Sequence, residues 1–414
     1  MKKYALSICL SLLFISLASC QPAYASLTYA GSIWSYNSGN NINSIDISAD
    51  GQYITTGTSG KLLFFFNRTS SVPLWNWTSP YSVHYVALSS DGAYLAMGAT
   101  DFMVSNTNRF CLFATNTSTM IWNYTARDWL NGLDMASDGS KIVVGYCYGQ
   151  LFLFNHTHVI PLINKSVMSY YTPAISEDGT VIAVGSNEGL NNNCKFYVFN
   201  ATSAKELWNY YSYGQIGVID LTPDGQYIVG GVDFGGNRTY LFNSSKNQPI
   251  WYHEAGAGIN SVSISADGQY LCAGSNDNIL YVFHQNSSTP LWNYTAGDIV
   301  TSVAISADGR FIAMGSYDDH LYFFNRSSSN PLWNYTFTSG VYRVSMDLNC
   351  EYIVAAVGNT IYLFNRNGTV TIGGGGQGIP GFQFLYVLVF GTSIGLLVHF
   401  LKTSKQNSNS LPFV

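Results

Sequence analysis

The chain has 414 residues, of which 10% are charged and 15% are aromatic, and its formal net charge is -5. Few charges and many Tyr, Phe and Gly residues are typical of β-rich proteins and exclude a chain built from long amphipathic helices. No segment gathers Lys and Arg residues, which excludes nucleic acid as a partner because no basic surface faces a phosphate backbone.

Residues 1–25 have the pattern of a secretory signal peptide. Lys2 and Lys3 precede a long apolar run, and residues 23–25 (Ala-Tyr-Ala) offer a cleavage site of the A-x-A type. The four residues that end at Cys20 resemble the lipobox of membrane lipoproteins and are the alternative processing site. We expect export and cleavage after residue 25.

A motif of about forty residues repeats eight times over residues 31–370. Asp-Gly pairs recur at intervals of 40 to 47 residues, and the eighth copy has Asn349 in place of the Asp. Seven of the eight copies have a Trp 16 residues before this position. These are Trp34, Trp75, Trp122, Trp208, Trp251, Trp292 and Trp333. The period is that of one four-stranded propeller blade.

Each copy predicts four strands. The segment VAISADGRFIAMGS contains two β-rich runs joined by Asp-Gly, a pair that suits a tight hairpin turn. LYFFN predicts a third strand and PLWNYT a fourth. One such sheet cannot bury both faces alone, so the copies must stack, and a ring leaves no open end. We therefore predict an all-β fold, an eight-bladed β-propeller.

The two ends of the repeat region complement each other. Trp34 lies in an outer-type strand with no inner strands before it, whereas the last copy ends at its third strand, residues 361–365. We predict that the N-terminal strand completes the last blade and closes the ring.

The repeats resemble two propeller families. SISADGQYLCAGSNDNILYVF resembles WD-repeat propellers, and LYFFNRSSSNPLWNYT resembles quinoprotein-like (PQQ-type) propellers, in which a Trp docks between blades. The third strand ends in Phe-Asn, as at Phe66-Asn67, where WD repeats have Trp-Asp. The resemblance implies an architecture and no particular activity, because propellers host many functions. We expect no cofactor, no metal and no catalytic residue.

The C-terminal segments predict a membrane anchor. Residues 371–381 are a Gly-rich linker, and residues 382–401 are uncharged and long enough to cross a hydrocarbon core of ~30 Å as a helix. Lys402 and Lys405 then place residues 402–414 in the cytoplasm. Residues 380–382 (Pro-Gly-Phe) resemble the start of the archaeal PGF-CTERM tails, which implies an archaeal cell-surface protein.

Fourteen N-x-S/T sequons occur in the chain, and most recur at two places in the repeat. The first group follows the third strand, and the second follows the Trp. We predict glycans on these residues, with copied repeats lacking any modification as the alternative. The predicted sites are Asn67, Asn76, Asn123, Asn155, Asn200, Asn243, Asn293, Asn325 and Asn334.

One face of the predicted ring collects the turns between second and third strands and between blades. Aromatic and acidic residues of these turns form the candidate binding face, because such mixtures suit a peptide, a glycan or a cation. They are Asp128, Trp129, Tyr146, Tyr148, Glu188, Asp277, Asp318 and Asp319. Ordinary solvated loops are the alternative interpretation.

The sequence therefore predicts an exported, membrane-anchored propeller at the cell surface. We expect it to bind an extracellular protein or glycan as a scaffold rather than to act as an enzyme. An extracellular quinoprotein-like oxidoreductase or a sugar-processing propeller enzyme is the alternative.

Overall fold

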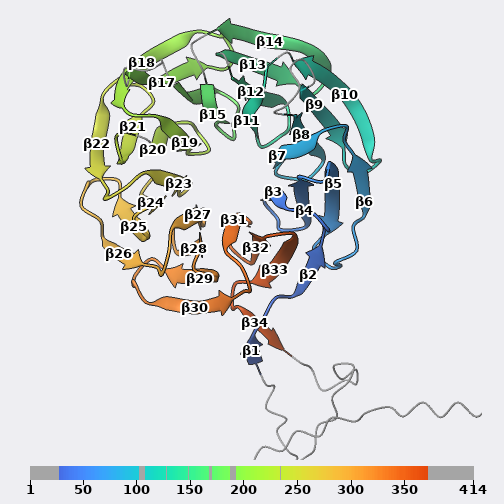
Figure 1. Ribbon diagram of the computed structural model, residues 1–414. Coiled ribbons are helices and arrows are strands. Elements are labelled where there is room, and N and C mark those ends of the chain that lie inside the picture. The colour runs from blue at the N-terminus through green and yellow to red at the C-terminus, as the bar shows by residue number, and fades with distance from the viewer. Residues whose placement is uncertain are drawn as a thin grey trace, which may run out of the picture. The chain divides into compact units, whose positions relative to one another are not determined.

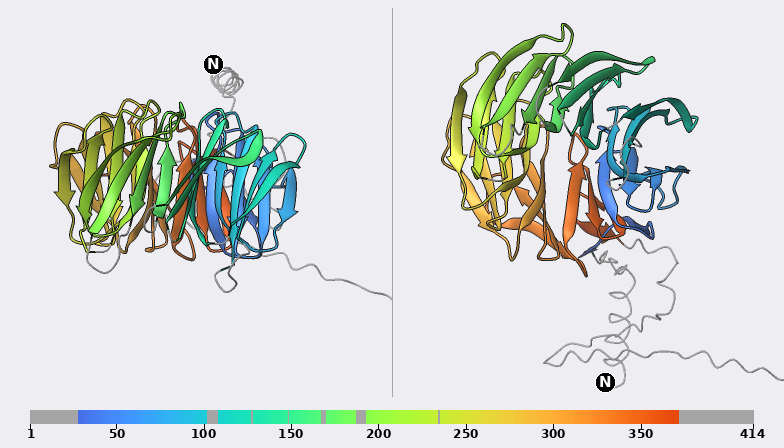
Figure 2. Two further views of the ribbon diagram at one scale, coloured as in Figure 1. Left: turned by 90° about the horizontal axis from the view of Figure 1, so that it is seen from above. Right: turned by 45° about the horizontal axis from the view of Figure 1, so that its top comes forward.

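The structure, a computed structural model, describes residues 28–101, 108–126, 128–147, 149–166, 170–186, 193–233 and 235–371. Within them, the compact unit Tyr29–Val370 contains eight four-stranded antiparallel sheets, arranged as blades around a central channel (Figure 1). Seen from the side, the strands run between the two faces of the ring (Figure 2). The predicted all-β, eight-bladed propeller is confirmed.

The first four blades each follow chain order from the channel outward. Blade 1 consists of β3 (Ile42–Ile47), β4 (Tyr53–Thr58), β5 (Leu62–Asn67) and β6 (Trp75–Thr78). Blade 2 consists of β7 (Ser82–Leu88), β8 (Tyr94–Thr100), β9 (Asn108–Ala114) and β10 (Thr119–Ala126). Blade 3 consists of β11 (Leu130–Met135), β12 (Lys141–Tyr146), β13 (Gln150–Asn155) and β14 (His158–Ser166). Blade 4 consists of β15 (Tyr170–Ile175), β16 (Val181–Ser186), β17 (Asn193–Asn200) and β18 (Glu206–Tyr213).

The next three blades repeat this order. Blade 5 consists of β19 (Ile216–Leu221), β20 (Tyr227–Val232), β21 (Arg238–Asn243) and β22 (Pro249–Glu254). Blade 6 consists of β23 (Ile259–Ile264), β24 (Tyr270–Ser275), β25 (Ile279–His284) and β26 (Trp292–Thr295). Blade 7 consists of β27 (Val300–Ile305), β28 (Phe311–Ser316), β29 (His320–Asn325) and β30 (Pro331–Thr336).

Blade 8 combines strands from both ends of the propeller. Its inner strands are β31 (Val341–Met346), β32 (Tyr352–Val357) and β33 (Thr360–Asn365), and its outer strand is β2 (Trp34–Asn37). In the antiparallel pairing, Trp34 lies opposite Leu363 and Asn37 opposite Thr360. Next to it, β1 (Thr28–Ala30) pairs with β34 (Thr369–Thr371) in a two-stranded sheet.

Burial within a blade follows the residue pattern of each strand. In β28 and β29 four or five consecutive residues are buried, because neighbouring blades cover both faces of the inner strands. The outer strand β30 instead alternates between half-buried and exposed residues, with Trp333 turned inward and Leu332 and Asn334 turned outward.

The hydrophobic core lies between blades rather than inside one of them. Eight buried clusters are found, and each joins two successive blades. One of them joins blade 8 to blade 1, where Val354 and Leu363 pack with Ile54 and Phe66. Since each blade shares its apolar faces with two neighbours, the copies depend on one another for burial.

The repeated Trp residues connect adjacent blades. The indole Nε1–H of each of the seven Trp residues donates a hydrogen bond to a backbone carbonyl in the turn after the third strand of the next blade, at 2.6 to 3.1 Å. Trp292 of blade 6, for example, donates to the carbonyl of Arg326 in blade 7. The copy without a Trp leaves the junction between blades 3 and 4 without this bond.

The Asp-Gly pairs form capped turns between first and second strands. In blade 7, the Asp308 Oδ1 accepts the Ser306 hydroxyl at 2.7 Å and the Arg310 backbone N–H at 3.0 Å. Gly309 adopts a φ of 64°, which a residue with a Cβ rarely tolerates. The Gly is therefore needed for the backbone and the Asp for its side-chain hydrogen bonds.

The predicted signal peptide and membrane segment fall outside the described residues. This applies to residues 1–25 and to residues 372–414, which include most of the linker, the predicted helix at 382–401 and the tail. Among the residues that the structure does describe, no helix has the length and apolar character required to span a membrane.

Candidate binding site

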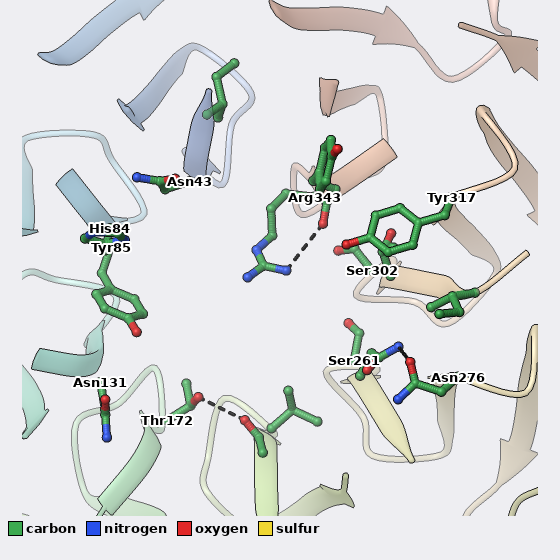
Figure 3. Close-up of a pocket in the computed structure, with 17 residues that line it drawn as sticks. Asn43, His84, Tyr85, Asn131, Thr172, Ser261, Asn276, Ser302, Tyr317 and Arg343 are labelled. Carbon is green, nitrogen blue, oxygen red and sulfur yellow. Dashed lines mark hydrogen bonds between the residues drawn. The ribbon is translucent and has the colours of Figure 1, made fainter. Parts of the chain in front are cut away.

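The first strand of each blade lines the central channel, and one end of the channel widens into a cavity. Asn43, Asn131 and Asn260 are the second residues of β3, β11 and β23, and they line this cavity of about 750 Å³ (Figure 3). Asn276 and Tyr317, from turns between second and third strands, also line it. We call it the channel mouth, and it opens on the face that the sequence predicts for binding.

Arg343 is the charged group of the channel mouth. It is the third residue of β31, its side chain is exposed, and its guanidinium extends toward the middle of the cavity (Figure 3). Its Nη1 donates a hydrogen bond of 3.3 Å to the Tyr342 carbonyl. No Asp or Glu is found among the described residues that line the mouth. Burial lowers the pKa of His84, so this lining residue stays neutral at pH 7.

Three tyrosines supply the aromatic surface of the mouth. Tyr317 and Tyr342 pack edge to face with ring centres 5.4 Å apart, and they are 42% and 41% exposed. Tyr85 lies across the cavity, where burial raises its pKa to about 12. Its hydroxyl therefore keeps the proton and remains a hydrogen-bond donor at neutral pH.

A second, smaller cavity of about 290 Å³ lies at the other end of the first strands. We call it the far cavity. Asp46, Asp134 and Asp220 line it, each at the fifth residue of the first strand in blades 1, 3 and 5. Glu177 and Asp347 line it as well. The two ends of the channel thus differ in charge, with a guanidinium at the mouth and carboxylates at the far end.

These three Asp side chains join neighbouring blades. Asp134 accepts the backbone N–H of Met135 at 2.8 Å and that of Ile175 in blade 4 at 2.9 Å. Asp46 and Asp220 make the same pair of bonds to their own strand and to the next blade. Burial raises the pKa of Asp134 to about 7 and those of Asp46 and Asp220 to about 6, against the opposing effect of these N–H donors.

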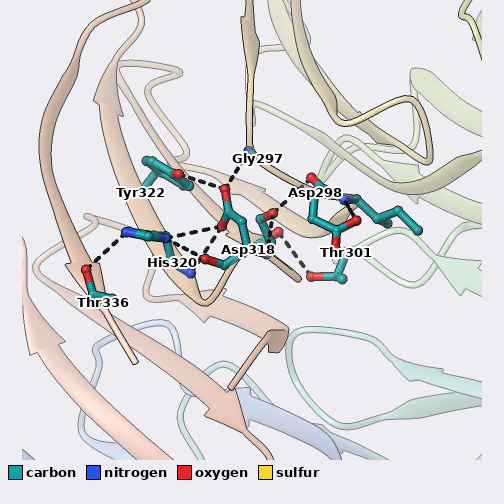
Figure 4. A network of polar contacts seen from close by, with 10 residues as sticks. Gly297, Asp298, Thr301, Asp318, His320, Tyr322 and Thr336 are labelled. Atoms are coloured by element: carbon teal, nitrogen blue, oxygen red, sulfur yellow. Dashed lines mark hydrogen bonds and ion pairs between the residues drawn. The ribbon is translucent and has the colours of Figure 1, made fainter. Parts of the chain in front are cut away.

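Two residues of the predicted binding face organise turns. The Asp318 Oδ2 accepts the Gly297 N–H at 2.7 Å and the Tyr322 hydroxyl at 2.8 Å (Figure 4). Asp277 does the same in the preceding blade, with Gly256 and Tyr281, both at 2.7 Å. Each carboxylate therefore binds a Tyr of its own blade and a Gly in the connection from the preceding blade, which the sequence pattern did not reveal.

The cluster around Asp318 does not assemble a metal site. The Nδ1 of His320 lies 2.7 Å from the Asp318 backbone carbonyl, and its Nε2 lies 3.0 Å from the Thr336 hydroxyl. Asp319 has a φ of 69° and its carbonyl accepts the Phe337 N–H. Across the described ranges, no group of three or more His, Cys, Asp or Glu side chains is placed to hold a metal.

The other predicted residues of the binding face have different environments. Asp128 and Trp129 precede β11, where their carbonyls accept hydrogen bonds from Asn108 and Cys147. Tyr146 is fully buried against Phe152 and is not available to a partner. Tyr148 and Glu188 lie outside the described residues.

The predicted glycosylation sites fall into two structural groups. In the first group the Asn closes the turn after the third strand, where its Oδ1 accepts the N–H two residues later. Asn325, for example, accepts the Ser327 N–H at 2.9 Å and the Ser327 hydroxyl at 2.7 Å. The same N–H bond occurs at Asn67, Asn155, Asn200 and Asn243. In the second group, on the outer strands, the Asn is exposed; it comprises Asn76, Asn123, Asn293 and Asn334.

Sequence comparison identifies the repeats. Residues 31–67, 248–284 and 288–325 match the family model described as WD domain, G-beta repeat. Each match begins near the outer strand of one blade and ends with the third strand of the next, so the sequence repeat is offset from the blade. A search of curated proteins finds no match.

Solved structures of the same architecture are similar at low sequence identity. Sqt1 from Chaetomium thermophilum, bound to the N-terminus of the ribosomal protein L10, has a TM-score of 0.68 and 15% identity, covering 81% of this chain and 100% of that one. The computationally designed Ika8 protein has a TM-score of 0.65 and 12% identity, covering 80% and 97%. This chain is therefore an eight-bladed β-propeller, and three of its segments match the WD repeat model.

The cavity opens on the face that the sequence predicts for binding, but the sequence alone did not name the residues that line it. Tyr342 and Arg343 are the second and third residues of β31, and Tyr85 is the fourth residue of β7, in apolar-looking stretches. A signal for them exists in the repeat itself, because residues aligned with Tyr342 or Arg343 line the cavity in other copies, among them Asn43, Thr172 and Ser261. Aligned in this way, the third position holds small or neutral residues in the other copies and Arg only at 343.

Proposed function

We propose that this protein is a non-enzymatic scaffold that binds a protein partner at the channel mouth. The observation behind the proposal is the mouth itself, an open cavity of about 750 Å³ lined by side-chain amides and by the exposed Tyr317 and Tyr342. Exposed Tyr rings supply contact area together with a polar hydroxyl, a combination enriched at protein interfaces. Sqt1, a similar propeller, is bound to the N-terminus of a ribosomal protein.

The experiment is affinity capture with the full-length chain in mild detergent, followed by identification of the retained proteins. The mouth variant combines Tyr317→Ala with Tyr342→Ala, and the control combines Tyr211→Ala with Tyr213→Ala, two exposed tyrosines on the outer strand β18. We expect the mouth variant to lose the partner and the control to keep it. Equal capture by both variants contradicts the proposal.

We also propose that the propeller lies outside the cell and is anchored by residues 382–401. The support comes from the sequence: an N-terminal signal pattern and an uncharged run of 20 residues followed by Lys402 and Lys405. Protease added to intact cells is expected to digest the propeller and to leave a short membrane-bound fragment. A propeller protected in intact cells and digested only after lysis contradicts this location.

For glycosylation we propose the outer-strand group of sequons rather than the turn group. Asn293 and Asn334 are exposed on the rim, whereas Asn325 and the other turn residues use their side chains to close a turn. Intact mass of the protein from its native host is expected to fall by about one glycan in Asn334→Gln, whereas Asn325→Gln is expected to change it only by the one methylene group that Gln adds. A mass without any added sugar rejects the proposal.

We further propose that β2 fastens the ring. The support is its pairing with β33 as the outer strand of blade 8, together with the Trp34 hydrogen bond to Arg68 of blade 1. The first contact joins β2 to blade 8, and the second joins it to blade 1, so β2 contacts both blades at the place where the two ends of the propeller meet.

A further inference from the structure

We infer that the channel mouth binds a carboxylate of an acidic peptide segment, with the Arg343 guanidinium as its charged donor. The inference rests on the proposed function in one respect, which is that the mouth is the surface for the partner. It adds the chemistry that this partner must present.

The environment of Arg343 differs from that of five other arginines in the described residues. Arg238 and Arg310 lie beside the carboxylates of Glu254 and Asp308. Arg68, Arg326 and Arg366 are each held over an aromatic ring. Arg343 donates to one backbone carbonyl, and none of the described residues that line its cavity is acidic. A guanidinium has five N–H donors, so most of its capacity faces the open mouth.

The neighbours of Arg343 favour an acceptor-only ligand. The hydroxyls of Tyr85 and Tyr317 point into the mouth (Figure 3), and both can donate a hydrogen bond to a ligand. An ionised carboxylate accepts hydrogen bonds and donates none, and it pairs with a guanidinium in the short, strong bonds of charge-assisted type. A ligand that is itself a cation finds no carboxylate among the lining residues.

Much of the mouth is already fixed before a ligand arrives. Asn260 donates to Asn276 at 2.8 Å and to the Val300 carbonyl at 3.1 Å. The Thr301 hydroxyl lies 2.5 Å from the Val341 carbonyl. These bonds tie Asn260, Asn276 and Thr301 to neighbouring strands, so these wall residues need little reordering when a ligand binds.

The size and charge of the mouth favour a peptide over a polyanion. A single guanidinium matches one carboxylate at a time, whereas a phosphate chain needs a row of cations. The volume of about 750 Å³ accommodates several side chains, and the paired rings of Tyr317 and Tyr342 offer apolar contact for the remainder of a peptide. At the opposite end of the channel the described lining includes Asp46, Asp134 and Asp220 and no Lys or Arg, so no guanidinium competes there for the ligand.

The test measures binding of a fluorescein-labelled hexaglutamate peptide to the full-length chain by fluorescence anisotropy. Arg343→Gln is expected to weaken binding by about tenfold or more, because it removes a charge-assisted pair. Arg343→Lys keeps the charge and is expected to weaken it less, since an ammonium lacks the fork of donors. Arg310→Gln, on the turn between β27 and β28, is the matched control and is expected to leave the affinity unchanged.

Each remaining outcome has a defined meaning. If the wild type and Arg343→Gln bind hexaglutamate with equal affinity, the inference is wrong. It is also wrong if the wild type binds a hexaglutamine peptide as tightly as hexaglutamate. Binding of trigalacturonate without binding of hexaglutamate contradicts it as well, because the ligand is then a sugar acid and not a peptide. This result can be distinguished from that of the capture experiment. If the Tyr317/Tyr342 variant loses its partner while Arg343→Gln binds hexaglutamate as well as the wild type does, the proposed scaffold function stands. Only the inference that the mouth binds a carboxylate is then wrong. Arg343 is exposed, so its variants are expected to unfold at the temperature of the wild type.

Discussion

At the scale of single residues, one indole N–H connects each pair of blades at seven of the eight junctions. Each Trp is half-buried on an outer strand and also packs against an aromatic ring of the next blade, as Trp251 does against Phe283 at 5.3 Å. Ring packing and hydrogen bonding by the same Trp side chain therefore both hold adjacent blades together. The turn carbonyl that accepts the bond is left without this partner when the indole is removed.

Trp251→Phe is expected to lower the free energy of unfolding by about 1–2 kcal/mol, because it removes the 2.7 Å bond to the Gln285 carbonyl along with part of the ring. The measurement is urea denaturation followed by circular dichroism. Trp77→Phe is the control, since Trp77 packs on Phe113 and its indole makes no hydrogen bond. A loss as large in the control shows that ring size, and not the bond, is responsible.

At the scale of elements, a blade is held by its neighbours more than by its own strands. The inner strands are buried on both faces, and every apolar cluster spans a junction. Blade 8 is special because β2 and β33 come from opposite ends of the propeller. The pairing of β2 with β33 is therefore one contact between the two ends of the propeller, beside the buried cluster that joins blade 8 to blade 1.

The double variant Ser35→Cys with Tyr362→Cys tests this pairing, because the two residues lie directly opposite each other. We expect a disulfide that raises the free energy of unfolding by about 2–4 kcal/mol, since it restrains a very long loop in the unfolded chain. Thermal unfolding of the oxidised and reduced forms of the same variant measures the gain. Free thiols after mild oxidation would show that β2 does not stay beside β33.

At the scale of the whole molecule, charge is separated along the channel. Arg343 stands at the mouth, while Asp46, Asp134 and Asp220 stand at the far cavity in alternate blades. Burial favours the neutral form of these three carboxyls, so their pKa values rise from the ordinary 3.8 to about 6 or 7. At pH values between the ordinary 3.8 and these raised pKa values, the folded protein thus binds more protons than the unfolded chain.

The stability that comes from these carboxyls is expected to fall as the pH rises. A raised pKa in the folded state gives stability that is present below the unfolded value of 3.8 and is lost as the pH passes through about 6 to 7. Asp134→Asn removes one such proton, so the drop in melting temperature between about pH 5 and about pH 8 should be smaller than in the wild type. Its absolute melting temperature should also be lower, because the amide cannot accept from both Met135 and Ile175. An unchanged pH dependence contradicts the role of Asp134.

The sequence by itself determined the architecture, because the repeat period, the Asp-Gly turns and the Trp spacing are local features that any copy reveals. It also indicated which turns share a face. Contacts between copies were decided only by the tertiary structure. Asp277 and Asp318 lie in exposed-looking turns, yet each carboxylate accepts a hydrogen bond from a Gly in the connection from the preceding blade as well as from a Tyr of its own blade.

The candidate site needed the closed ring for the same reason. Arg343 and Tyr85 come from blades 8 and 2, and their side chains meet across a cavity that exists only when the first strands surround one axis. No spacing along the chain shows which residues face each other across this cavity. Local hydrogen bonding and periodicity act within one copy, whereas burial, charge and the shape of the mouth arise from all eight together.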